Sequence, residues 1–196
     1  MTPARAVRAT LVGLALGVLL TQFGFTLMRV TGSSMDPNLR EGEVLLVLRP
    51  PLLALSDLLA GRAPGARLAE RGAVVVLPDP RAEGGPLGVG RPLIVKRVVG
   101  LPGDTVALAR GRVLVDGEEL SEPWLDPAHR GASTMRPRAV PPGALFLLGD
   151  NRLPLASSDS RSFGPQPVTA LRGRAVAELR LPWGEAGPRS PLAPLP

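Results

Sequence analysis

Seven short apolar runs, each bounded by glycine, proline or aspartate, most constrain the fold that this chain can adopt. They are rich in valine and leucine and lie at 43–48, 73–78, 93–100, 105–109, 112–117, 144–149 and 174–181. Short runs of this kind between turn residues are typical of β-strands. Glycine and proline, with 23 residues each, favour tight turns over long helices. The sequence therefore predicts a mostly β domain.

Two turns and three irregular segments can be assigned between these runs. DGEE at 116–119 is expected to form a hairpin turn, and LPGD at 101–104 a type II turn with Pro-Gly at its centre. The segment 78–91 is expected to be a loop, and EAGPRSPLAPLP at 185–196, in the Pro-rich tail 182–196, to be disordered. LLALSDLLAGRA at 52–63 has helical apolar spacing within an insertion at 52–70. Its apolar face could pack on the core or rest on a bilayer, and we favour the core.

A run of twenty residues without a charge, ATLVGLALGVLLTQFGFTLM at 9–28, indicates a membrane-anchored protein. A helix of about 20 residues crosses the hydrocarbon core of a membrane. Arg5 and Arg8 precede the run, so residues 1–8 are expected in the cytoplasm. A cleaved signal peptide and a buried helix are the alternatives. The residues at the end of the run, MRVTGSS, lack the A-x-A cleavage site of a signal peptide. We therefore expect a single-pass anchor in the plasma (inner) membrane, with residues 29–181 outside the cytoplasm.

Composition excludes several kinds of chemistry. The chain has no cysteine and a single histidine, His129, so thiol catalysis and Cys or His-cluster metal sites are excluded, and no cofactor is expected. The net charge of +6 comes from arginines that are scattered through loops without interleaved aromatic residues. This pattern argues against nucleic-acid binding. The sequence does not predict an oligomeric state.

Lys96 is the only lysine, and every other member of the 23 Lys and Arg residues is arginine. Chance retention is one explanation. The other is chemical: a guanidinium cannot lose its proton in a protein, whereas burial can lower the pKa of an amine until it does. Lys96 lies in the apolar run 93–100, so it is a candidate general base.

Ser34, in TGSSMDPNLR (31–40), is the matching candidate nucleophile. It follows Met28 by only six residues, which span at most about 20 Å. On its own, Ser-Met-Asp-Pro is typical of a simple turn, because a serine needs a neighbouring base to act as a nucleophile. His129, a carboxylate or Lys96 could supply that base. His129 lies in a polar loop segment, so we favour a Ser34–Lys96 dyad.

In their order along the chain, these motifs resemble those of the bacterial type I signal peptidases. The matching stretches are TGSSMDPNL, AVVVLP, LIVKRVVGLPGD, RVLVDGEEL with EPWL, VPPGALFLLGDNR, SSDSRSFG and VTALRGRA, behind the apolar run. The resemblance implies an antiparallel β-sheet catalytic core with an inserted β extension, at 104–141, behind one N-terminal transmembrane helix. It also implies a serine endopeptidase that cleaves signal-peptide regions from exported preproteins at the lipid bilayer, through an acyl-enzyme.

The resemblance assigns roles to residues at the centre of the site. Ser34 corresponds to the nucleophile and Lys96 to the general base. Met35 corresponds to a residue that lines the pocket for a small substrate side chain. Gly32 stands where some members carry a serine that donates to the oxyanion, so the backbone N–H of Ser34 would take that role here.

Supporting residues follow from the same resemblance. Asp150, Asp159 and Arg161 match positions that support the site, through ion pairs with arginines such as Arg97. Ser157 matches a serine that hydrogen-bonds the base. GDNR and DSR are separated by LPLASS, about two residues longer than the usual family spacing. If the extra residues bulge outward, Ser157 keeps this role; otherwise Ser158 takes it.

Three other functions remain open on the sequence alone. A related Ser/Lys protease of pilin or transfer-system type would carry the same dyad on another substrate. A self-cleaving repressor relative would need a DNA-binding N-terminus in place of the apolar run. An anchored, non-catalytic peptide-binding module would not need Ser34 and Lys96.

Overall fold

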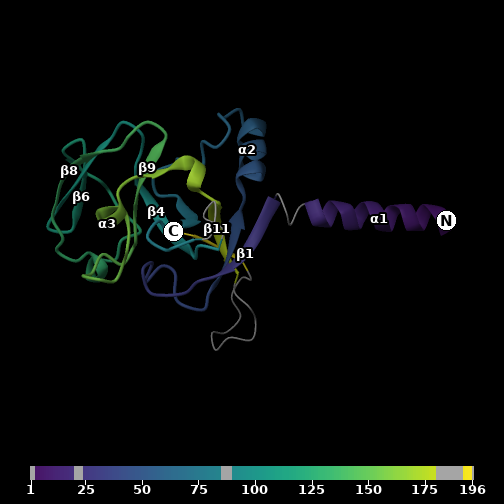
Figure 1. The fold of residues 1–196 in the computed structure, drawn as a ribbon, viewed down its shortest axis with the longest axis horizontal. Coiled ribbons are helices and arrows are strands. Elements are labelled where there is room, and N and C mark those ends of the chain that lie inside the picture. Colours follow the sequence, from purple (N-terminus) through teal and green to yellow (C-terminus); the bar gives the residue numbers. More distant parts are fainter. Residues whose placement is uncertain (1–2, 20–23, 85–89, 180–191, 196) are drawn as a thin grey trace.

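The computed structural model describes residues 3–19, 24–84, 90–179 and 192–195. Two antiparallel β-sheets form the body of the molecule, and a single helix, α1 (Pro3–Leu19), stands away from it (Figure 1). The mostly β architecture that the apolar runs predict is confirmed, and so are the antiparallel sheets that the family resemblance implies.

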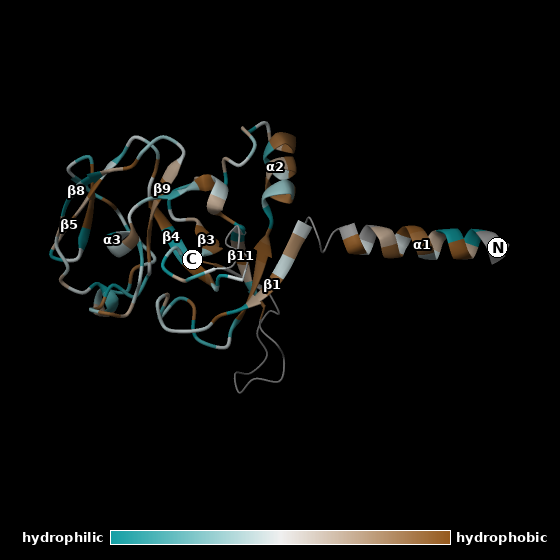
Figure 2. Ribbon diagram, viewed as in Figure 1, coloured by the Kyte–Doolittle hydropathy of each residue, from teal (hydrophilic) through white to brown (hydrophobic). Residues whose placement is uncertain are grey.

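The larger sheet has eight strands, in the order β1-β2-β11-β3-β4-β9-β10, with β12 paired to β11. Its strands are β1 (Phe25–Arg29), β2 (Val44–Leu48), β3 (Val74–Pro78), β4 (Leu93–Gly100), β9 (Ala144–Leu148), β10 (Gln166–Pro167), β11 (Gly173–Leu179) and β12 (Leu192–Pro194). Hydrophobic residues predominate in its central strands (Figure 2). Both faces of β3 and of the second half of β4 are buried, which explains their unbroken apolar runs.

The smaller sheet has the order β7-β6-β5-β8. Its strands are β5 (Thr105–Ala109), β6 (Arg112–Val115), β7 (Glu118–Glu119) and β8 (Met135–Ala139). All four lie in sequence between β4 and β9, which pair with each other in the larger sheet. The segment expected as a β extension therefore leaves the larger sheet after β4 and returns to it at β9.

Three groups of buried apolar side chains hold these layers together. One lies under helix α2 (Pro50–Leu59), a second under the segment that follows β1, and a third between the two sheets. The third group includes Val106 and Val113 of the smaller sheet and Phe146 and Leu148 of the larger one. The two sheets thus share a core and form one body.

Both predicted turns are present. Gly103 has φ of 95°, and the N–H of Asp104 donates to the carbonyl oxygen of Leu101 at 3.0 Å, as in a type II turn. Asp116 and Gly117 both have positive φ between the paired strands β6 and β7. Positive φ at both central residues is what a tight hairpin requires.

The N-terminal apolar run differs from the expected helix at 9–28. Within the described residues α1 spans Pro3–Leu19, residues 20–23 of the expected helix lie outside them, and Phe25–Arg29 forms β1, which pairs along its whole length with β2. Within the part of the chain that the structure describes, no helix has both the length and the hydropathy to cross a membrane. Hydropathy misplaced this boundary because Phe25-Thr26-Leu27-Met28 suits a strand as well as an apolar helix, and pairing with β2 satisfies its backbone.

Three further segments can be compared with expectation. The helical spacing at 52–63 corresponds to α2, and residues 60–70 are mostly turns. The loop expected at 78–91 is described only in part, since residues 85–89 lie outside the described residues. The expectation of disorder at 185–196 is wrong for β12, whose backbone pairs with Ala177–Leu179 of β11, while residues 185–191 and 196 lie outside the described residues. Short helices α3 (Ser160–Phe163), η3 (Pro127–His129) and η4 (Val168–Ala170) complete the fold.

Candidate active site

Strand β4 carries Lys96 into the interior of the larger sheet. The strand lies between β3 and β9, and Lys96 is opposite Val75 of β3. Only 2% of its surface is exposed. A lysine in such a position must lose much of the hydration that favours its charged form.

Ser34 meets this amine from the segment that follows β1. The Lys96 Nζ lies 2.8 Å from the Ser34 Oγ and donates a second hydrogen bond, also of 2.8 Å, to the carbonyl oxygen of Val95. The two residues that sequence reasoning singled out, 62 positions apart, are therefore in direct contact. A neutral amine at this distance can accept the hydroxyl proton.

The environment of Lys96 makes the neutral amine accessible. Burial lowers the pKa of Lys96 from 10.5 to about 8. The carboxylates of Asp159, Asp79 and Asp150 oppose this shift, and the Arg161 guanidinium adds to it. At pH 8 about half of the molecules then carry a neutral amine, compared with well under 1% for a free lysine.

Two asparagines fix the Ser34 segment to the turn that follows β9. The backbone N–H of Asn151 donates to the carbonyl oxygen of Ser34 at 3.1 Å, and its Nδ2 donates to that of Ser33 at 3.1 Å. Asn38 Nδ2 donates to the carboxylate of Asp150 at 2.8 Å and to the backbone of Trp124. These bonds hold the Ser34 segment in the position where its hydroxyl contacts Lys96 of β4.

A buried ion pair joins β4 to the same turn. Arg97 Nε and Nη2 donate to the two carboxylate oxygens of Asp150, at 2.9 Å and 2.7 Å, and both side chains are almost fully buried. The guanidinium also lies over the Trp124 ring, 4.9 Å from its centroid. The expected pairing of Asp150 with Arg97 is present in the structure.

Asp159 organises the opposite side of the site. Its carboxylate accepts from Arg161 Nε and Nη2, both at 2.8 Å, from the Gly149 N–H at 3.1 Å and from the Ser157 hydroxyl at 2.9 Å. It also caps α3 by accepting from the Arg161 N–H. Because Gly149, Ser157 and Arg161 all donate to this one buried carboxylate, the segment 149–161 is fixed around Asp159.

Ser157, rather than Ser158, is directed into the site. Residues 153–156 form an exposed turn, so the extra residues bulge outward. A side chain at Gly149 would collide with the Ser157 hydroxyl and with the Ser34 carbonyl oxygen, which shows how closely these three residues pack. The Ser158 hydroxyl instead contacts Ser162 at an exposed position. Among the hydrogen bonds of the described residues, none joins Ser157 directly to Lys96.

The segment around Ser34 carries the groups that are expected to contact substrate. The Ser34 N–H has no hydrogen-bond partner among the described residues, so it is free to donate to an oxyanion. Gly32, two residues before it, has φ of 83°, in the left-handed region that favours glycine. Met35 is 2% exposed and packs with Val30 and Leu39 beneath the segment.

His129 belongs to a different part of the molecule. It ends η3, and its Nδ1 lies 3.5 Å from the carboxylate of Asp126. It makes no contact with Ser34 in the described structure, whose hydroxyl meets Lys96. No group of His, Asp or Glu side chains in the described ranges is arranged to hold a metal ion.

Sequence reasoning missed three residues of the site: Asn38, Trp124 and Asn151. Each lies inside a matching motif, yet nothing in the motifs says what these side chains contact. A buried partner for Arg97 is predictable from charge, whereas a Trp ring beneath it depends on a contact between residues 27 positions apart.

Comparison with known proteins agrees with this geometry. The family described as "Signal peptidase, peptidase S26" matches residues 4–180. The chain belongs to the peptidase S26 signal peptidase family. The matched residues include the whole region in which the contacts above occur.

Individual S26 relatives are similar over most of their length. The signal peptidase I of Bacillus licheniformis is 32% identical over 164 residues, covering 80% of this chain and 76% of that protein. That of Bacillus amyloliquefaciens is 31% identical, with 79% and 73% covered. A crystal structure of a signal peptidase I from Enterococcus faecalis V583 is 30% identical over 54% of this chain and 94% of that one, with a TM-score of 0.43.

Proposed function

We propose that this S26 family member is a membrane-associated serine endopeptidase that removes signal peptides from exported preproteins, with Ser34 as nucleophile and Lys96 as general base. The 2.8 Å contact between the only lysine amine and the Ser34 hydroxyl carries this proposal. Family membership gives the substrate class, because the relatives matched over most of their length are signal peptidases.

The chemistry follows from the contact. The neutral Lys96 amine takes the proton of the Ser34 hydroxyl while Oγ bonds to the carbonyl carbon of the scissile peptide bond. The Ser34 N–H donates to the resulting oxyanion. The carbon–nitrogen bond then breaks, and the amine returns its proton to the leaving amino group. Water, deprotonated by the same amine, hydrolyses the ester, and the proton goes back to Oγ.

Supporting roles follow from the hydrogen bonds around the dyad. Asp150 with Arg97 and Asp159 with Arg161 would hold the two sides of the site in register. Ser157, whose hydroxyl is fixed by Asp159, would position the segment beside Ser34. Met35 would form the floor of a pocket that admits a small side chain before the cut.

Association with the plasma membrane is part of the proposal. The described part of α1 exposes apolar side chains, among them Leu11, Val12 and Leu14, behind the cationic Arg5 and Arg8. We propose that the apolar N-terminal segment contacts the bilayer, with the N-terminus on the cytoplasmic side and the β body outside the cytoplasm. A signal peptide in the same bilayer would then emerge close to Ser34.

The test is incubation of the detergent-solubilised full chain with a preprotein whose signal peptide ends in Ala-x-Ala. We expect a single cut after the second alanine, located by mass spectrometry, and no cut by Ser34→Ala. A cut at another position would indicate a related processing protease with a different substrate specificity. Equal cleavage by Ser34→Ala would overturn the assignment of the nucleophile.

A further inference from the structure

Helix α2 presents its apolar side to solvent and its only charge to the interior. Asp57 is fully buried together with Leu53, whereas Leu55, Leu58 and Leu59 are 53%, 63% and 81% exposed. With 3.6 residues per turn, these three leucines share one side of the helix. The segment predicted to pack on the core therefore does so through Leu53, while the leucine ridge, Leu55, Leu58 and Leu59, faces outward.

The buried charge fixes this orientation. The Asp57 carboxylate pairs with Arg67, whose Nε lies 3.2 Å from Oδ1 and whose backbone N–H donates to Oδ2 at 3.3 Å. Rotating α2 to bury the leucine ridge would bring Asp57 to the surface and break this pair. The pairing of Asp57 with Arg67 therefore keeps the three leucines on the outer side of α2. Exposed contiguous apolar surface is uncommon unless it contacts a partner.

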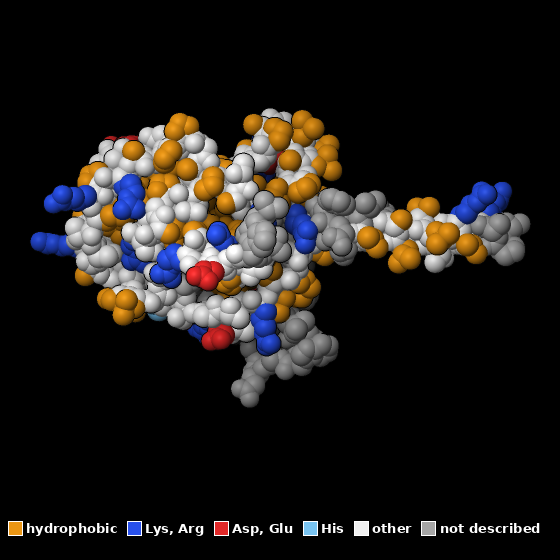
Figure 3. Space-filling model, in the orientation of Figure 1, with side chains coloured by type: hydrophobic (Ala, Val, Ile, Leu, Met, Phe, Trp, Pro, Cys, Tyr) orange, Lys and Arg blue, Asp and Glu red, His pale blue; other side chains and the backbone are white. Residues whose placement is uncertain are grey.

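Helix α2, which carries the leucine ridge, begins beside the point where the apolar N-terminal segment joins the body. The N–H of Arg49, the residue that caps α2, donates to the carbonyl oxygen of Gly24 at 2.8 Å. Gly24 directly precedes β1, whose Leu27 is 52% exposed. Figures 1 and 3 show α2 at the same end of the body as α1, with hydrophobic side chains gathered on its outer side.

Charge around the ridge suits an anionic surface. Arg49 precedes the helix and Arg62 follows it, with Arg62 exposed, and Asp57 is the only acidic residue of α2. A helix with an apolar side, flanking arginines and no exposed acid is suited to the boundary between acidic headgroups and acyl chains.

We propose that α2 is an interfacial helix whose leucine ridge inserts into the surface of an anionic bilayer and orients the β body on it. The bilayer is favoured over a second copy of the chain because α2 begins beside the apolar N-terminal segment, lies at the same end of the body as α1, and is flanked by arginine. The inference concerns how the body sits on lipid and does not depend on peptidase activity.

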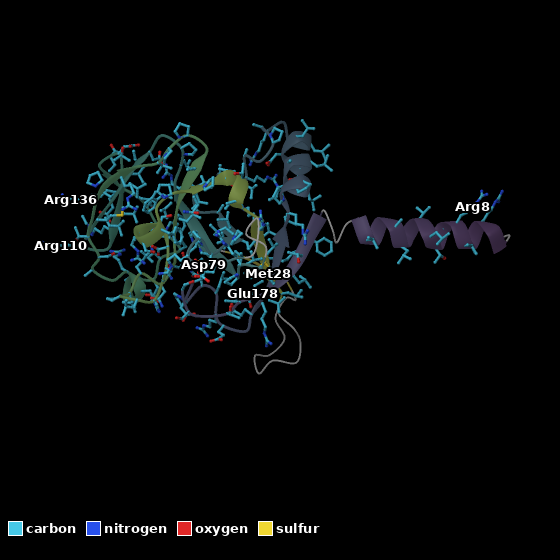
Figure 4. All side chains as sticks on the ribbon, in the orientation of Figure 1. Arg8, Met28, Asp79, Arg110, Arg136 and Glu178 are labelled. Carbon is cyan, nitrogen blue, oxygen red and sulfur yellow. The ribbon has the colours of Figure 1, made fainter. Side chains whose placement is uncertain are left out.

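The absence of cysteine allows a direct test in the full chain. Leu58→Cys is labelled with an environment-sensitive dye, and the protein is placed in nanodiscs of phosphatidylglycerol and phosphatidylcholine whose acyl chains carry bromine. Arg136→Cys, exposed on β8 in the smaller sheet, is the matched control; Figure 4 shows Arg136 far from α1. We expect several-fold stronger quenching by brominated lipid at residue 58 than at residue 136, and the reverse order with aqueous iodide.

Each other outcome contradicts the proposal. Equal quenching by iodide at both positions would mean that the ridge stays in water. Protection of residue 58 from both iodide and brominated lipid would mean that protein covers it, and cross-linking through the same cysteine would identify a second copy. Circular dichroism of both variants checks the fold, and Arg62→Gln should reduce lipid quenching at residue 58 if the anionic headgroups contribute.

Discussion

At the scale of single residues, the amine of Lys96 is held where its charged form is poorly solvated and its neutral form contacts Ser34. Lys96→Arg should therefore reduce kcat/KM by about 10²–10⁴-fold or more, because guanidinium cannot accept the hydroxyl proton. Product formation is measured beside circular dichroism. Arg136→Lys, the reverse exchange at an exposed site, is the control and should leave the rate unchanged. Substantial activity in folded Lys96→Arg would remove Lys96 from its proposed role.

The pH dependence follows from the same amine. Its pKa is about 8, so kcat/KM should fall as pH decreases through this value and the amine becomes charged. The Asp79 carboxylate raises the pKa of Lys96, so Asp79→Asn should move the acid limb to lower pH. The measurement is the pH profile of both proteins with a short peptide substrate. A limb in Asp79→Asn that moves to higher pH, or stays in place, would contradict this account of the electrostatics.

Burial of Lys96 should also destabilise the fold. Its pKa is lower in the folded state than the 10.5 of an exposed lysine, so the unfolded chain binds more protons between pH 8 and 10.5. Stability contributed by this residue therefore rises with pH across that interval. Lys96→Met should raise the free energy of unfolding by about 3 kcal/mol at pH 7, with little gain near pH 10.5. Urea unfolding at both pH values measures this, and a gain independent of pH would point to packing instead.

At the scale of elements, the Arg97–Asp150 pair connects β4 to the turn after β9. Asp150→Ala should cost about 3–5 kcal/mol, because it leaves a buried guanidinium without its carboxylate. Glu119→Ala breaks an exposed pair with Arg112 in the smaller sheet and should cost less than about 1 kcal/mol. Urea unfolding of the two variants gives the comparison. Equal losses would mean that the buried pair does not hold the site together.

Local pattern predicted strands better than it predicted the orientation of helices. The runs 93–100 and 105–109 coincide with β4 and β5, since Gly, Pro and Asp mark their ends. Apolar spacing at 52–63 identified α2 but could not say which side meets the core, because that depends on the pairing of Asp57 with Arg67. The end of the N-terminal helix was misplaced because β1 is defined by its partner, β2.

The candidate site was predicted unevenly for the same reason. Ser34 and Lys96 could be predicted because the chain has a single lysine and because the serine motif TGSSMDPNL follows the apolar run directly. The side chains that hold them depend on contacts between distant segments, such as Asn151 with the backbone of Ser33 and Ser34. Motif spacing left Ser157 and Ser158 as alternatives; the Ser157 hydroxyl bonds Asp159 and that of Ser158 contacts Ser162, and the role of either serine toward Lys96 stays a prediction.

At the scale of the whole molecule, the N-terminal helix and the β body are separable, with the boundary before β1. Helix α1 stands apart in Figure 1, and its described side chains are exposed, whereas Phe25–Arg29 completes the edge of the larger sheet. A chain that lacks residues 1–19 should therefore keep its melting temperature. One that lacks residues 1–29 should melt lower, because it exposes the backbone of β2. Equal melting temperatures for the two truncations would mean that β1 contributes no stability.

Removal of residues 1–19 also separates chemistry from localisation. Cleavage of a short soluble peptide should be unchanged, because the dyad and its supporting residues lie beyond residue 29. Cleavage of a preprotein embedded in vesicles should fall by about 10²-fold, since confinement to one surface raises the effective concentration of enzyme and substrate. The residual activity on vesicles should depend on α2 and decrease further with Leu58→Gln, whereas the soluble peptide is cut as before. An equal decrease on both substrates would place the effect of truncation in the site itself and not in attachment to the bilayer.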